Sequence, residues 1–118
     1  MSLRIIIRNI KYWFQRRTRG WSDDETWDLN YEFILWCNSR FKKYREKAIK
    51  IVDLEYYKFE YKDNIYTQLQ VIDRIIELTD YIINNDYYEM MWSDVEHLEA
   101  MKNEIFDLFK MSFGAMWW

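Results

Sequence analysis

Residues 65–85, IYTQLQVIDRIIELTDYIINN, decide the fold class of this 118-residue chain. Apolar residues recur there every three or four positions, which is the period of an α-helix. They cover so wide a side that the helix must be buried over much of its circumference: Ile65, Leu69, Val71, Ile72, Ile75, Ile76, Leu78, Ile82 and Ile83. The chain has no proline and two glycines, so helix breakers are rare. We therefore expect an all-α fold.

A second amphipathic pattern opens the chain and stops at Gly20. Its apolar side repeats at three-four spacing: Leu3, Ile6, Ile7, Ile10, Trp13 and Phe14. After Gly20, Ser22 and Glu25 form a capping box that predicts a new helix start, and Asp23 and Asp24 add the negative charge that a helix N-terminus favours. We expect this second helix to run to about residue 50.

The C-terminal part contains the remaining boundaries. Residues 51–61 are too densely aromatic for a clean helical pattern, so we expect an irregular connection there. Asn84-Asn85-Asp86 ends the central helix, Ser93 and Glu96 form a second capping box, and Gly114 ends the last helix. Met116-Trp117-Trp118 then forms a tail. The prediction is a single helical domain over residues 1–118, a small bundle of three to four helices.

Composition excludes several classes of protein. Half of the residues are apolar, too many for a disordered chain. The N-terminus lacks the continuous apolar run of a secretory signal, and no run reaches the roughly 20 residues needed to cross a bilayer. Cys37 is the only cysteine, which excludes an intrachain disulfide. We therefore expect a cytoplasmic protein with no membrane contact.

No arrangement of residues indicates catalysis. His97 is the only histidine, and with Asp94 it falls short of a metal site. Cys37 lies in an apolar run without a base beside it, where it serves as a small core residue. The chain contains no phosphate loop and no serine elbow. We expect neither enzyme activity, nor a cofactor, nor a metal.

Charge is distributed unevenly along the chain. Residues 1–50 have 12 Lys and Arg against 6 Asp and Glu, whereas residues 51–118 have 5 against 14. Attraction between the two halves, within one subunit or between subunits, explains this better than contact with nucleic acid or a membrane, since the whole chain is acidic. The basic stretch from Arg40 to Lys50 has no helix-turn-helix around it, so duplex DNA is an improbable partner.

The best candidate site is a cluster of arginines and tryptophans around Gly20, where arginine could neutralise a phosphate and an indole could stack on a base. It consists of Arg16, Arg17, Arg19, Trp21 and Trp27. Two structural alternatives stay open: packing of Trp21 on its own helix as a staple residue, and pairing of Arg19 with Asp23 or Asp24. The aromatic content, including Trp117-Trp118, also favours contact with protein and a homo-oligomer.

The chain resembles a family of small proteins encoded by tailed bacteriophages and prophages. Two segments are similar: Arg19-Gly20-Trp21-Ser22-Asp23 followed by Trp27-Asp28-Leu29-Asn30, and Leu108-Phe109 with Phe113 and Met116-Trp117. Asn30 stands where the family has aspartate, and residues 50–66 depart from its pattern. The resemblance implies a phage accessory gene, many of which encode inhibitors of bacterial defence.

Two mechanisms follow from that resemblance. The first is sequestration of a cyclic nucleotide signal, without turnover, by an oligomer that uses arginine and aromatic residues. The second is direct inhibition of a bacterial defence protein or another host protein. A purely structural or assembly role is a third possibility.

Overall fold

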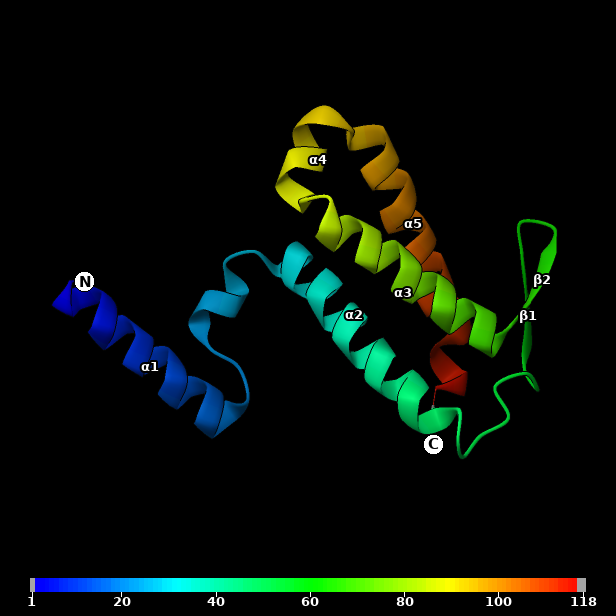
Figure 1. Ribbon diagram of the computed structural model, residues 1–118, viewed down its shortest axis with the longest axis horizontal. Helices are drawn as coiled ribbons and strands as arrows, with labels where there is room; N and C mark the ends of the chain where they lie inside the picture. Colours follow the sequence, from blue (N-terminus) through cyan, green and yellow to red (C-terminus); the bar gives the residue numbers. More distant parts are fainter. Residues whose placement is uncertain (1, 117–118) are drawn as a thin grey trace. The chain divides into compact units, whose positions relative to one another are not determined.

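The computed structural model describes residues 2–116 and is mostly helical (Figure 1). Helix accounts for 75% of it, in five α-helices and two short 3-10 helices, beside one two-stranded sheet. The prediction of a helical protein is confirmed. The prediction of a three- to four-helix bundle is wrong, because the structure has a fifth α-helix and a sheet that the prediction did not include. The chain divides into two compact units, Met1–Phe33 and Ile34–Trp118. Folding as one domain and assembly into a homo-oligomer stay predictions.

The first unit contains helix α1 (Leu3–Arg19) and the short 3-10 helix η1 (Asp23–Thr26). The Ser2 hydroxyl caps α1 by accepting the Arg4 amide at 3.1 Å. Gly20 ends it with φ +86°, a conformation that favours glycine. The predicted capping box at Ser22 is present but begins only η1, whereas helix α2 (Leu29–Ala48) starts later. A capping box satisfies the amides of one turn and does not set the length of a helix.

The second unit contains an antiparallel hairpin that the sequence did not predict. Strand β1 (Lys58–Tyr61) pairs with β2 (Asn64–Thr67), and Tyr61 faces Asn64 at the turn. The turn residues Lys62 and Asp63 have φ of 51° and 66°. Positive φ at both positions is the geometry of a two-residue turn that matches the twist of the strands. The dense aromatic stretch expected to be irregular therefore includes a strand, a structure that aromatic residues favour.

Three helices follow the hairpin: α3 (Gln68–Asn84), α4 (Tyr87–Ser93) and α5 (Val95–Ser112). Helix α3 ends where the sequence predicted. Helix α4 was not predicted. Its N-cap, Asp86, has a φ of 58°, and this turn in the backbone is not marked by a glycine in the sequence. The Asp86 carboxylate accepts the Tyr88 amide at 3.1 Å and so starts the helix.

The predicted boundaries of the last helix are wrong. The Ser93 hydroxyl donates to the Glu89 carbonyl at 2.9 Å, within α4, so it does not cap α5. At the other end, α5 stops at Ser112 and a 3-10 turn, η2 (Phe113–Ala115), contains Gly114. Of the predicted tail, Trp117 and Trp118 lie outside the described residues.

The core of the second unit lies where α2, α3, α4 and α5 meet. Its buried apolar residues include Ile34, Cys37, Phe41, Val71, Ile72, Ile75, Leu78, Ile82, Tyr87, Met90, Leu98, Met101, Ile105 and Leu108. Cys37 is a core residue, as predicted, and burial raises the pKa of its thiol to about 12. Ile65 is not: it lies on β2 and is 70% exposed.

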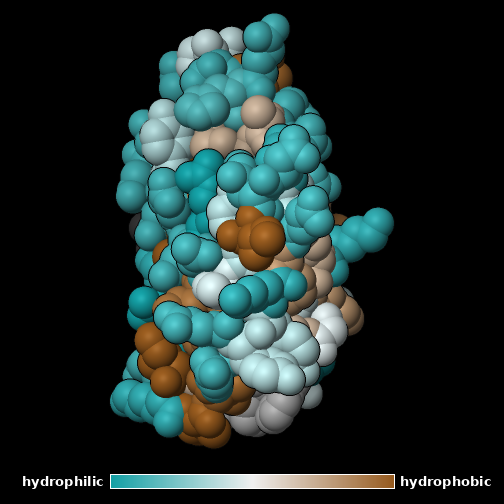
Figure 2. All heavy atoms as spheres, turned by 90° about the vertical axis from the view of Figure 1, so that its right-hand side faces the viewer, coloured by the Kyte–Doolittle hydropathy of each residue, from teal (hydrophilic) through white to brown (hydrophobic). Residues whose placement is uncertain are grey.

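The surface seen from the hairpin side is mainly hydrophilic, with separate hydrophobic patches (Figure 2). Scattered apolar residues are ordinary on a protein surface. None of the helices in residues 2–116 is both long enough and apolar enough to span a bilayer.

Candidate functional site

The predicted arginine and tryptophan cluster lies in the first unit, at the end of α1 and in the turn that follows (Figure 1). Arg16, Arg17 and Arg19 all belong to the last turn of α1, where positive charge is favoured by the helix dipole. Gly20 then reverses the chain, so that η1 and its cap Ser22 return along the helix. The local sequence thus explains why charged and aromatic side chains gather here.

Ser22 is the structural centre of this turn. It is fully buried, and its amide donates to the Glu25 carboxylate at 2.6 Å. The Arg16 guanidinium donates to its hydroxyl at 2.9 Å and lies 3.7 Å from the Asp24 carboxylate. Arg16 therefore holds the turn against α1, which is a structural task.

Arg19 makes three interactions with the same turn. Its Nη2 donates to Asp23 at 2.6 Å, and its Nε donates to the Trp21 carbonyl at 2.9 Å. Its guanidinium carbon lies 3.8 Å from the centroid of the Trp21 ring, which is a close cation–π stack. The structure thus shows the predicted Arg19–Asp23 pair and also stacks Arg19 on an exposed indole.

Asp23 joins the turn to α1 through residues that the sequence analysis missed. Its carboxylate accepts a hydrogen bond from the Gln15 side-chain amide at 2.8 Å, and the Gln15 side-chain oxygen accepts one from the Asp23 backbone amide at the same distance. Lys11 lies 3.5 Å away. Lys11, Gln15 and Arg19 follow one another at four-residue spacing, so helical periodicity would have placed them on one side.

These contacts hold the pKa of Asp23 at about 2, chiefly through the Gln15 hydrogen bond and then through Arg19. Folding lowers the pKa of Asp23, so the ionised carboxylate stabilises the turn. This stabilisation is fully present at pH values above the usual pKa of 3.8 and is lost as the pH falls towards 2. An NMR titration of the carboxyl carbon should give a midpoint near 2 in the intact chain. Gln15→Ala should raise it; an unchanged midpoint would contradict this account.

Arg17 and Trp27 lie apart from the Arg19–Trp21 stack. Arg17 follows Arg16 by one residue and precedes Arg19 by two, so it projects from nearly the opposite side of α1 from Arg19. Its guanidinium lies 5.2 Å from the Trp13 ring. Trp27 packs edge-on against Tyr12 at 5.7 Å and is 67% exposed. The five predicted residues therefore form separate groups, with Arg16, Arg19 and Trp21 as the one that shares a surface.

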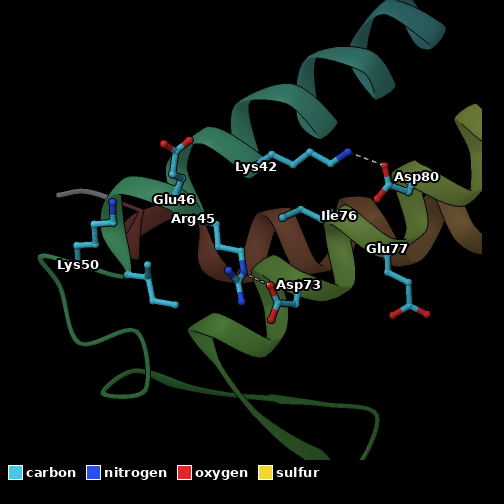
Figure 3. Close-up of a pocket in the computed structure, with 9 residues that line it drawn as sticks. Lys42, Arg45, Glu46, Lys50, Asp73, Ile76, Glu77 and Asp80 are labelled. Carbon is cyan, nitrogen blue, oxygen red and sulfur yellow. Dashed lines mark hydrogen bonds and ion pairs between the residues drawn. The ribbon is translucent and has the colours of Figure 1, made fainter.

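A groove in the second unit was not predicted (Figure 3). It is an open depression of about 800 Å3 between α2 and α3, and two ion pairs cross it: Lys42 with Asp80 at 2.8 Å and Arg45 with Asp73 at 2.5 Å. Lys50 also lines it, together with Glu46 and Glu77. Its three cations face four carboxylates, which does not favour an anionic ligand. It does show the expected attraction between the basic and acidic parts of the chain.

Within residues 2–116 no three histidine, cysteine or carboxylate side chains are grouped as a metal site would require. His97 is paired with Asp94 at 3.0 Å and lies beside the Tyr81 ring. The chain matches no protein-family model, no curated protein and no solved structure. The resemblance to phage proteins and the absence of catalysis therefore stay predictions.

Proposed function

We propose that this chain is a phage accessory protein that sequesters a small nucleotide signal in the bacterial cytoplasm without converting it. The observation that carries the proposal is the Arg19–Trp21 stack. A guanidinium held over an exposed indole offers both elements of nucleotide recognition, a cation for phosphate and a flat surface for a base. The cyclic nucleotide class rests on the resemblance to phage proteins.

Arg19 and Arg16 have acidic neighbours, which sets a condition on the ligand. Asp23 and Asp24 already compete for their donors. A phosphate must displace or share these contacts, and a ligand with two phosphates gains more from doing so than one with a single charge. Arg17, on the other side of the helix, is not part of this contact. We include assembly into a homo-oligomer in the proposal. A ligand bound to one exposed turn would remain open to solvent, whereas two subunits could enclose it.

Inhibition of a defence or host protein is the alternative, and one observation favours it. Trp21, Trp27 and Leu29 are all exposed and lie within nine residues of one another in the sequence, and Trp21 stacks with Arg19. Aromatic residues and arginine are enriched in the cores of protein interfaces. This alternative needs no phosphate and predicts retention of a bacterial protein instead.

Ultrafiltration tests the proposal and the absence of turnover together. Excess protein is mixed with a panel of cyclic mono- and dinucleotides and filtered, and both fractions are analysed by chromatography. We expect at least one nucleotide to be depleted from the filtrate and recovered intact after the protein is denatured. If the concentration of every nucleotide in the filtrate is unchanged, sequestration is contradicted and inhibition of a protein partner remains as the alternative. A chemically altered nucleotide contradicts the absence of turnover.

A further inference from the structure

Helix α1 exposes a continuous apolar side, which we call the α1 apolar face. It consists of Leu3, Ile6, Ile7, Ile10, Trp13 and Phe14, whose exposed fractions run from 41% for Ile6 to 71% for Leu3. Six large apolar residues on one side of a 17-residue helix exceed the isolated apolar residues that are normal on a surface. This face needs an occupant.

The rest of the first unit packs on another side of α1. Tyr12 is the only buried residue of the helix, and it packs against Trp27. Gln15 and Arg19 bind Asp23. Leu3, Ile7, Ile10 and Phe14 follow at spacings of three and four, while Tyr12 stands about half a turn away from them. The turn that binds α1 therefore leaves the α1 apolar face uncovered.

Charge indicates what kind of surface the face meets. Helix α1 contains six cationic residues, Arg4, Arg8, Lys11, Arg16, Arg17 and Arg19, and no acidic residue. Asp23 and Asp24 of the following turn pair with Lys11, Arg16 and Arg19, which leaves Arg4, Arg8 and Arg17 outside these ion pairs. Pairing with α1 of a second copy would bring two sets of like charges together. An anionic surface complements these charges.

We infer that α1 lies on an anionic membrane surface, with the α1 apolar face at the level of the lipid headgroups and with Arg4, Lys11 and Arg17, which flank or follow that face, among them. An apolar side with tryptophan and phenylalanine, a cationic remainder and low net hydrophobicity are the features of a helix that lies in the membrane interface. Trp13 suits that depth, and Arg17 beside it can extend its charge to lipid phosphate.

This inference contradicts the sequence-based expectation of no membrane contact, which rested on the length of uninterrupted apolar runs and on the acidic charge of the whole chain. A run-length criterion detects spanning helices only. The apolar residues of α1 are interrupted by cations in the sequence and come together only through helical periodicity. From Leu3 to Phe14 they extend about 17 Å along the axis, too short to span a bilayer but sufficient to lie on one.

Co-sedimentation with lipid vesicles tests this inference. We expect the intact chain to bind vesicles of phosphatidylcholine with roughly 30% phosphatidylglycerol, to bind pure phosphatidylcholine less, and to dissociate as salt is added. Ile7→Asp should weaken binding about tenfold, because it places a charge in the apolar face. Ile5→Asp is the matched control: it makes the same chemical change two residues away, on the side of Tyr12, and should alter binding less than about twofold.

Circular dichroism must show that both variants keep their helix content. Equal loss of vesicle binding in the two variants would mean that net charge alone governs attachment. That result would overturn the inference that the α1 apolar face inserts among the lipid headgroups. Failure of the intact chain to sediment with anionic vesicles would overturn the inference too. If Ile7→Asp then converted an oligomer into a monomer, the face would belong to a second copy. Failure to bind vesicles would not bear on nucleotide sequestration, which uses the opposite side of α1, whereas loss of an oligomer would also remove the subunit contact that the proposed function includes.

Discussion

Replacing Ile75 with alanine should lower the free energy of unfolding by about 2–5 kcal/mol, the range for removing a large aliphatic side chain from a packed core. Ile75 is fully buried on α3, which packs against α5. The cost combines the lost burial of three carbon atoms with the cavity that rigid neighbours leave open. Urea denaturation followed by circular dichroism measures it, provided that the slope of the transition stays unchanged.

Ile65→Ala is the matched control, and it separates the structure from the sequence pattern. The three-four spacing assigned Ile65 to the same buried helix side as Ile75, whereas the structure places it exposed on β2. Its replacement should cost less than about 1 kcal/mol. Equal destabilisation by the two substitutions would show that Ile65 is a core residue and would contradict its exposed position on the β1–β2 hairpin.

Helix boundaries were predictable where one residue type has a strong backbone preference. Gly20 ended α1 because its positive φ is accessible to glycine. The starts of β2 and α4 were not predictable in the same way, since their turns place Lys62, Asp63 and Asp86 at positive φ without a glycine. Positive φ is uncommon for residues other than glycine, and although aspartate adopts it more readily than most, its presence alone does not predict it.

The candidate site was predictable in composition but not in arrangement. The sequence grouped Arg16, Arg17 and Arg19 because they are neighbours, yet successive helical residues diverge by about 100°, so Arg17 separates from Arg19. Periodicity could have shown this separation and could have found Gln15. The close stack of Arg19 on Trp21 could not be predicted, because it depends on how Gly20 turns the chain.

Replacing Arg19 with alanine should weaken nucleotide binding about tenfold or more, the usual consequence of losing a charge-assisted hydrogen bond to phosphate. Arg4→Ala is the matched control, since it removes the same charge near the other end of α1 and should leave affinity within about twofold. Arg19 also binds Asp23, however, so its loss could act by loosening the turn. A second variant has to separate these two causes.

Asp23→Asn separates them, because it removes the acidic competitor and keeps Arg19. The most direct measurement is therefore the affinity for a cyclic nucleotide that the protein retains in ultrafiltration. Isothermal titration calorimetry gives this affinity for the intact chain and for Asp23→Asn. If Arg19 binds phosphate, affinity should rise in the variant, because the guanidinium no longer shares its charge with a carboxylate. If Arg19 only anchors the turn, affinity should fall in Asp23→Asn as it does in Arg19→Ala, and that result would contradict a ligand site at the Arg19–Trp21 stack.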